Sequence, residues 1–335
     1  MSSAQMLRAF RPGSLGGFGR RAAGPALLAL IALVCLAAPL CLAQPQPRQK
    51  LVHERTSRYY TIQVVDYPNE GRRAMVFSRA RGIESLMVLA DPDALDMAYC
   101  RTMVAALALP AECKDALLIG LGGASLPKFI QKQFPALRLD IVELDPDVVE
   151  VAAQYFSFRG SPNTRIFVLD GRLFLKRTEK KYDAILLDAY AGDRVPFHMT
   201  TLEFVSLVKR HLAPGGVVAT NLWDPARTRF LEAEKRTYQT SFPQTYLFDA
   251  AGSGNIVIFG TLDAETVAGS EWMHRAQKLA AGRELGFDLP DLVRTEYERL
   301  TPLRIQQAPL TDDMAPVDTL RREDPRHFEE GAPPP

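Results

Sequence analysis

Five short apolar runs, separated by segments of helical periodicity, constrain this chain more than any other feature of its sequence. The runs are ALLIG (116–120), LDIVEL (139–144), RIFVLD (165–170), DAILLD (183–188) and GVVATNL (216–222). Strands that are joined by crossover helices run parallel, and they are apolar along their whole length because helices cover both faces of the sheet. The alternation therefore predicts an α/β fold built on a parallel sheet.

Two further apolar runs complete the expected sheet. QTYLFDA (244–250) and GNIVIFG (254–260) are separated by three residues, so they form an antiparallel hairpin, which we place at the sheet edge. A seven-stranded, mostly parallel sheet with a terminal antiparallel hairpin is the class I methyltransferase-like Rossmann topology. Short strands within residues 58–89 predict a small β unit in front of it, and the later helices are expected at 226–240, 271–281 and 288–300.

The first 43 residues carry four arginines and no acidic residue, followed by an uncharged apolar stretch from Ala26 to Ala43. This pattern predicts a secretory signal peptide and an exported protein, periplasmic or secreted. An uncleaved membrane anchor is the alternative, because the stretch nearly reaches the ~18 residues that a spanning helix needs.

The mature chain keeps Cys100 and Cys113, which either pair in an oxidising compartment or stay free. The formal net charge of +1 gives no electrostatic case for binding nucleic acid.

These patterns divide the chain into six parts. They are a signal peptide or anchor (1–43), a tether (44–56), a small β domain (57–92), a Rossmann-like domain (93–265), a C-terminal helical extension (266–325) and a disordered tail (326–335).

Four motifs end successive strands of the predicted sheet. They are Gly120-Leu121-Gly122-Gly123, Glu143, Asp170-Gly171 and Asp188-Ala189-Tyr190. Taken singly, each has a structural explanation, such as a strand-to-helix turn or a helix N-cap. Ligands of open parallel sheets bind beyond the carboxyl ends of the strands, so together the motifs predict a nucleoside site. The acid that ends the second strand can accept both ribose hydroxyls, and the acid that ends the third strand can meet an adenine edge.

The glycine motif helps to choose the nucleoside. Residues 120–125 read G-L-G-G-A-S, which lacks the third glycine of a dinucleotide fingerprint, and no P-loop occurs. NAD is therefore the weaker alternative, and a sulfonium nucleoside is favoured by the topology.

The motifs LLIGLGG (117–123), VELDP (142–146), LDG (169–171) and LLDAY (186–190), followed by VPFHMTTLEF (195–204), make this chain resemble the spermidine and spermine synthases. The resemblance covers residues 57–260, with an echo at 310–317. It implies that Glu143 holds ribose, that Asp170-Gly171 holds adenine, and that Asp188 lies between the sulfonium and the incoming amine. An amine with a pKa near 10 must lose its proton before it attacks, and a carboxylate can orient it and accept that proton.

This chain departs from the family pattern where cationic substrates are held. Ala124 replaces an acid that pairs with the donor's propylamine in the synthases, and Ala191 stands where a second acid is expected, although Asp193 is near enough to substitute. Arg101 either attracts the carboxylate of ordinary S-adenosylmethionine or lies on a solvated helix face. Tyr190 is expected to contact substrate or to pack over the strand end.

Three functions follow, with the first preferred. It is aminopropyl transfer from decarboxylated S-adenosylmethionine, or from S-adenosylmethionine itself, to a polyamine-type amine, without a metal. The second is methyl transfer in the same pocket, and the third is a catalytically degenerate exported binding protein. The expected partner is a small-molecule amine; a membrane is involved only through an uncleaved N-terminal segment, and a homodimer is an open alternative.

Overall fold

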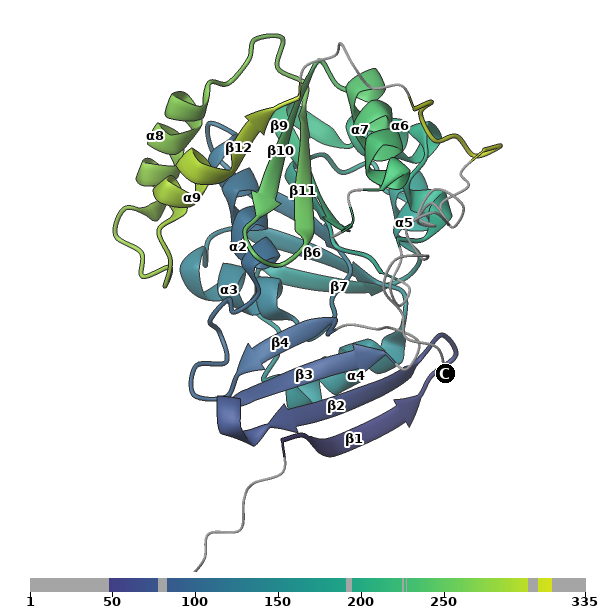
Figure 1. Ribbon diagram of the computed structural model, residues 1–335, viewed down its shortest axis with the longest axis vertical. Coiled ribbons are helices and arrows are strands. Elements are labelled where there is room, and N and C mark those ends of the chain that lie inside the picture. Colours follow the sequence, from purple (N-terminus) through teal and green to yellow (C-terminus); the bar gives the residue numbers. More distant parts are fainter. Residues whose placement is uncertain are drawn as a thin grey trace, which may run out of the picture. The chain divides into compact units, whose positions relative to one another are not determined.

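The computed structural model describes residues 48–77, 83–190, 195–224, 226, 228–300 and 307–314. Two sheets organise them (Figure 1). The smaller sheet is antiparallel, in the order β1 (Lys50–Thr56), β2 (Thr61–Tyr67), β3 (Arg72–Phe77) and β4 (Ser85–Val88). Predicted segments 1–43 and 326–335 lie outside the described residues.

The predicted tether over 44–56 is wrong from Lys50 onward, because Lys50–Thr56 form β1. This strand, KLVHERT, has too few apolar residues to be recognised from hydrophobicity. Backbone pairing with β2 forms it instead, and the His53 ring stacks on Tyr155 with ring centroids 4.6 Å apart. An edge strand buries little, so its apolar pattern is weak.

The larger sheet has the order β12-β10-β11-β9-β8-β5-β6-β7. Its parallel strands are β5 (Asp115–Ile119), β6 (Arg138–Glu143), β7 (Thr164–Val168), β8 (Tyr182–Leu187) and β9 (Leu212–Trp223). The strands β10 (Gln244–Ala250) and β11 (Asn255–Thr261) form the predicted antiparallel hairpin. The predicted α/β class and methyltransferase-like topology are confirmed.

The prediction of one helix over 288–300, and of the hairpin at the sheet edge, is wrong. Helix α9 (Leu289–Glu296) ends early, and β12 (Tyr297–Arg299) pairs antiparallel with β10 and becomes the edge. The Tyr297 ring packs near the rings of Tyr246 and Trp272, which anchors the strand. A three-residue strand is too short to show a period of two, so the helical pattern before it dominates the sequence.

Alternate residues of the central strands face two hydrophobic clusters, one on each side of the large sheet. Leu118 of β5 faces the cluster that includes α2 (Ala98–Val104), α3 (Ser125–Gln133), α4 (Pro146–Tyr155), α8 (Gly269–Ala280) and α9. Leu117 faces the cluster that includes α5 (Gly171–Arg177), α6 (Leu202–Arg210) and α7 (Arg229–Ser241). Within the described ranges, no helix is long and apolar enough to cross a membrane.

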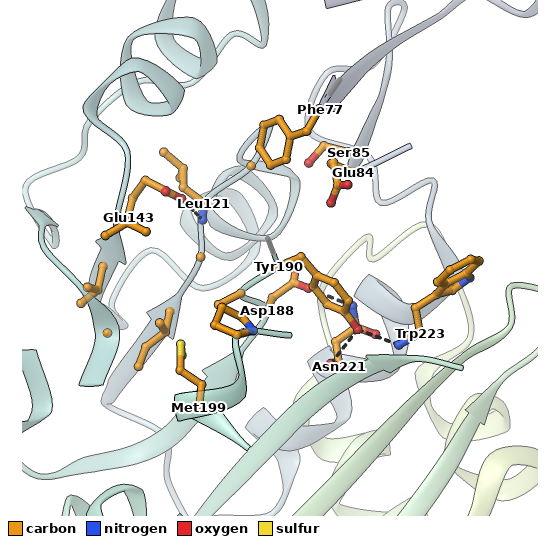
Figure 2. A pocket seen from close by; sticks show the side chains of 18 of the residues that line it. Phe77, Glu84, Ser85, Leu121, Glu143, Asp188, Tyr190, Met199, Asn221 and Trp223 are labelled. Carbon is orange, nitrogen blue, oxygen red and sulfur yellow. Dashed lines mark hydrogen bonds between the residues drawn. The ribbon is translucent and has the colours of Figure 1, made fainter. Parts of the chain in front are cut away.

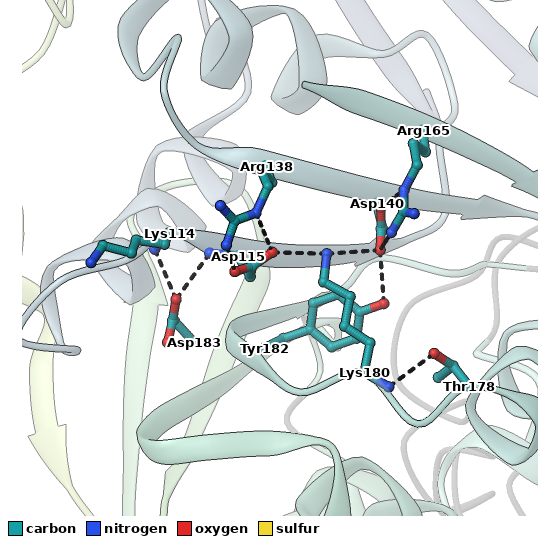
Figure 3. A network of polar contacts seen from close by, with 9 residues as sticks. All are labelled: Lys114, Asp115, Arg138, Asp140, Arg165, Thr178, Lys180, Tyr182 and Asp183. Atoms are coloured by element: carbon teal, nitrogen blue, oxygen red, sulfur yellow. Dashed lines mark hydrogen bonds and ion pairs between the residues drawn. The ribbon is translucent and has the colours of Figure 1, made fainter. Parts of the chain in front are cut away.

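A network of charges closes the amino-terminal edge of the large sheet (Figure 3). Asp140 of β6 is buried, and it accepts two hydrogen bonds of 2.8 Å from Arg165 and one of 2.9 Å from the Tyr182 hydroxyl. Lys180 bridges Asp140 and Asp115 at 3.2 and 2.8 Å. The buried charge of Asp140 is therefore paired, which offsets the cost of removing it from water.

A short turn near the C-terminus is tied to the α5–α6 face. Thr311 and Met314 pair with each other, and Asp312 between them accepts hydrogen bonds from Arg172 at 2.5 and 2.7 Å and from the Thr201 hydroxyl at 2.7 Å. Thr201 is itself the N-cap of α6. The turn therefore covers the start of the helix that follows β8 along the chain.

Candidate active site

A cavity of about 560 Å³ opens at the carboxyl ends of the parallel strands (Figure 2). Phe77 of β3, Ser85 of β4, and Tyr60 and Glu84 just before β2 and β4 form part of its wall, and helix α2 contributes Tyr99. The cavity thus lies between the two sheets, and the predicted strand-end residues that line it are Gly120, Gly122, Glu143, Asp170, Gly171, Asp188 and Tyr190.

The glycine loop is held tightly by its neighbours. Gly120 has φ +102°, and a Cβ atom there would lie 2.2 Å from the carbonyl oxygen of Asp188. The Gly120 N–H donates to Val142 O at 2.8 Å, and the Ala124 N–H donates to Leu121 O at 2.9 Å. Gly123 does not line the cavity: its N–H donates to the Ser85 hydroxyl at 2.8 Å, which locks β4 onto the loop.

Glu143 ends β6 with a buried carboxylate. Its Oε2 accepts the N–H of Leu121 at 2.9 Å, and its Oε1 accepts the N–H of Asp145 at 2.9 Å. Burial raises the pKa of Glu143, and these backbone donors oppose that rise by stabilising the charged form. Each carboxylate oxygen has a second lone pair, so both can also accept a hydroxyl from a ligand in the cavity.

Asp170 is the N-cap of α5, and its Oδ1 accepts the N–H of Leu173 at 2.8 Å. Its Oδ2 lies 2.9 Å from Nε2 of His198, and this contact lowers the pKa of Asp170. Gly171 follows, and a Cβ atom there would lie 2.4 Å from Ile119 Cγ2, so a larger residue would push α5 away from β5. The pairing with His198 has no signal in the sequence, because 28 residues separate the two.

Asp188 lies at the end of β8, and protein atoms surround its carboxylate although the residue keeps some contact with solvent. Its Oδ1 accepts a hydrogen bond from Asn221 Nδ2 at 2.8 Å, and its Oδ2 accepts one from the Tyr99 hydroxyl at 3.2 Å. Burial raises the pKa of Asp188 to about 6, and both hydrogen bonds act against that rise. A carboxylate tuned toward neutral pH is suited to accept a proton from a reacting group.

Tyr190 is fixed by hydrogen bonds to the backbone of β9. Its hydroxyl donates to Asn221 O at 3.1 Å and accepts the N–H of Trp223 at 2.6 Å, while its ring lines the cavity. The Tyr60 hydroxyl donates to Tyr190 O at 3.4 Å, and its ring stacks on Phe77 with centroids 4.4 Å apart. Tyr190 therefore packs over the strand end, as one of its two alternatives predicted, while its contact with substrate stays a prediction. Predicted residues Ala191 and Asp193 lie outside the described residues.

Arg101 does not reach the cavity. Its Nε donates to Leu95 O at 2.7 Å, and its guanidinium carbon lies 6.0 Å from the centroid of the Phe287 ring. The alternative in which it attracts a donor carboxylate is therefore wrong, because the side chain is used to fix the loop before α2.

Cys100 and Cys113 are free thiols. Across the described segments, no group of His, Cys, Asp and Glu side chains is arranged to hold a metal.

The described lining of the cavity includes four carboxylates and His198 but no Lys or Arg. Sequence reasoning missed Glu84, Ser85 and Asn221. Asn221 could have been found, since it lies near the end of the fifth strand at the same sheet edge. Glu84 and Ser85 had no signal, because they lie at the start of a strand of the other sheet.

Comparisons with known proteins find both aminopropyltransferases and methyltransferases. Residues 101–248 match the spermine/spermidine synthase domain. A polyamine aminopropyltransferase of Vibrio vulnificus is 34% identical over 245 residues, which cover 70% of this chain and 79% of that protein. The mouse eEF1A lysine and N-terminal methyltransferase is 31% identical over 174 residues, covering 49% of this chain and 25% of that protein. A spermidine synthase solved with the transition-state analogue AdoDATO shares the fold, with a TM-score of 0.61 at 17% identity, covering 74% of this chain and 84% of that one.

Proposed function

Because this chain belongs to the spermine/spermidine synthase family, we propose that it transfers the aminopropyl group of decarboxylated S-adenosylmethionine to a small-molecule amine. The observation that carries the choice of donor is the charge of the cavity. Its described lining holds the strand-end acids Glu143, Asp170 and Asp188 but no Lys or Arg. Such a cavity favours ligands with several positive charges and no negative one.

The two candidate donors differ by one carboxylate. The decarboxylated donor carries a sulfonium and an ammonium, whereas S-adenosylmethionine adds an anion, and no Lys or Arg of the described lining could pair with it. Two like unit charges about 5 Å apart at an effective dielectric constant of about 20 repel by about 3 kcal/mol. This repulsion supports the aminopropyl donor although Ala124 provides no acid of its own.

The strand-end residues have distinct roles in the proposed reaction. Glu143 accepts the ribose hydroxyls, and Asp170 with the Gly171 backbone faces the adenine. Asp188 orients the amine and accepts its proton while the new N–C bond forms and the C–S bond breaks, which releases methylthioadenosine. Its pKa of about 6 reduces the pKa difference between the Asp188 carboxyl and the amine, so the proton transfer costs less free energy. A sulfonium is already a good leaving group, so positioning contributes most of the rate.

Methyl transfer is the second candidate. It is favoured by Ala124, which replaces the acid expected in an aminopropyltransferase, and by the 31% identity to a lysine and N-terminal methyltransferase. The same Asp188 would then deprotonate the amine that accepts the methyl group.

We also propose that the protein is exported, as predicted from residues 1–43. The mass of the purified protein would test this, because cleavage of a signal peptide removes those residues.

Calorimetric titration with decarboxylated S-adenosylmethionine, S-adenosylmethionine and methylthioadenosine separates the two functions. Aminopropyl transfer requires that the decarboxylated donor binds tightest, and that a diamine then triggers release of methylthioadenosine. Asp188→Asn should abolish this release while nucleoside binding persists. Tighter binding of S-adenosylmethionine, with methyl transfer to the amine, would establish the second candidate. If none of the three ligands binds, the nucleoside site itself is wrong.

A further inference from the structure

Two side-chain hydrogen bonds in series connect the first residue of β11 to the carboxylate of Asp188. Asn255 Nδ2 donates to Oδ1 of Asn221 at 3.0 Å, and Asn221 Nδ2 donates to Oδ1 of Asp188 at 2.8 Å. Asn221 and Asn255 are 3% and 8% exposed, and both line the cavity. Figure 2 shows Asn221 beside Asp188. The three residues come from separate elements, the end of β8, β9 and β11.

The orientation of the Asn221 amide decides which form of Asp188 it stabilises. An amide has a donor end and an acceptor end, and a half-turn exchanges them. The donor end stabilises the ionised carboxylate, whereas the acceptor end stabilises the protonated acid, because only the acid can donate to it. In the structure the acceptor end is occupied by the Asn255 amide group, so the donor end faces Asp188.

We propose that Asn255 is a positioning residue that acts through Asn221 to keep Asp188 ionised and fixed in place. Without the Asn255 donor, the buried Oδ1 of Asn221 loses its partner, and a half-turn toward a protonated Asp188 relieves that cost. The importance of this for catalysis rests on the proposed function, since that function makes Asp188 the proton acceptor. The effect on Asp188 itself does not depend on turnover.

Other titratable groups also surround Asp188. Tyr99 of α2 donates to Oδ2 at 3.2 Å, and Cys100 follows it along the same helix. Among the residues that the structure describes, the remaining titratable side chains of the cavity are those of Tyr60, Glu84, Glu143, Asp170, Tyr190 and His198. Substitution of Asn255 removes none of these groups, so a change in the titration of Asp188 reports on the two amides.

Asn255→Leu tests the proposal, because it keeps the size of the side chain and removes the donor. Thr261→Val, at the other end of β11, is the matched control for disturbance of the strand. The Asp188 carboxyl is titrated by carbon NMR and assigned with Asp188→Asn. We expect Asn255→Leu to raise the pKa of Asp188 by about one unit, the equivalent of a hydrogen bond to a charged group. The acidic side of the pH profile of turnover should shift upward by the same amount, so that turnover falls by about tenfold at pH 5 and hardly at all at pH 8.

Asn221→Leu should give a shift at least as large, and the double variant should add nothing to it, because both residues act on Asp188 through one amide. If Asn255→Leu does not fold, Asn255→Ala takes its place. An unchanged pKa of Asp188 in a folded variant would overturn the proposal, as would an equal shift in Thr261→Val. If the protein binds no donor, the proposed function fails, whereas the NMR shift still decides the role of Asn255.

Discussion

Gly120→Ala is the substitution that most directly tests how the glycine loop supports the site. The added Cβ would lie 2.2 Å from the carbonyl oxygen and 2.7 Å from the carbonyl carbon of Asp188. Real Cβ atoms stay at least about 3 Å from such atoms, so the strand end that holds Asp188 must move by about 1 Å. The φ of +102° adds backbone strain, since side chains of L-residues rarely adopt it.

Both effects can be given a size. Overpacking of this kind costs about 1–3 kcal/mol and backbone strain adds about 1–2 kcal/mol, so the free energy of unfolding should fall by about 2–5 kcal/mol. A misplacement of about 1 Å lowers turnover by about 10²-fold. Denaturant unfolding measures the first quantity, and release of methylthioadenosine measures the second.

Gly71→Ala is the matched control, because Gly71 has φ +64° and nothing within 4 Å of the added Cβ. It should cost about 1 kcal/mol through backbone strain and leave turnover unchanged. If Gly120→Ala is no less stable than Gly71→Ala and keeps full turnover, then Gly120 does not position Asp188, and the reasoning is wrong.

Three further predictions concern charges. Turnover should fall as the pH drops through about 6, because the Asp188 carboxyl becomes protonated. Asp188→Asn should lower turnover by about 10²–10⁴-fold above pH 7, and its defect should shrink below pH 6, where the unsubstituted protein has also lost the carboxylate. A flat pH profile of the unsubstituted protein would contradict this. Glu84→Gln should weaken calorimetric binding of the decarboxylated donor by about tenfold but leave methylthioadenosine unaffected, with surface Glu70→Gln as the control; an equal effect on both ligands would point to a structural role. Asp312→Asn should lower the melting temperature near neutral pH, and the difference from the unsubstituted protein should shrink as the pH falls from 4 toward 2. Arg172 holds the pKa of Asp312 at about 2 in the folded protein. The Asp312 carboxylate therefore stabilises the fold above the pKa of the unfolded chain, and this stabilisation is lost as the pH falls through the pKa of the folded protein.

The parallel sheet could be predicted because its central strands are apolar and buried on both faces. The positions of Glu143, Asp170 and Asp188 could be predicted from the same pattern, since the carboxyl ends of parallel strands meet at one edge. The structure brings these three residues into one cavity, while their individual roles stay predictions.

The features that could not be predicted from the sequence share a physical cause. Strands β1 and β12 lie at sheet edges, where backbone pairing decides the structure and hydrophobic periodicity is weak. Contacts such as Ser85 with Gly123, or Asn255 with Asn221, join segments that are 38 and 34 residues apart and create no local motif. A sequence pattern reports the burial of one element, so it is silent about side chains that meet across two.

The glycine loop also limits what this fold could evolve to bind. The backbone N–H groups of Gly120, Leu121, Gly123 and Ala124 all donate within the protein, to Val142 O, Glu143, Ser85 and Leu121 O. Loops that hold a pyrophosphate need such groups pointing at the ligand. Acquiring a dinucleotide would therefore require this loop to give up its hold on β4 and β6 first, whereas an uncharged ribose with a cationic tail needs no donors from it.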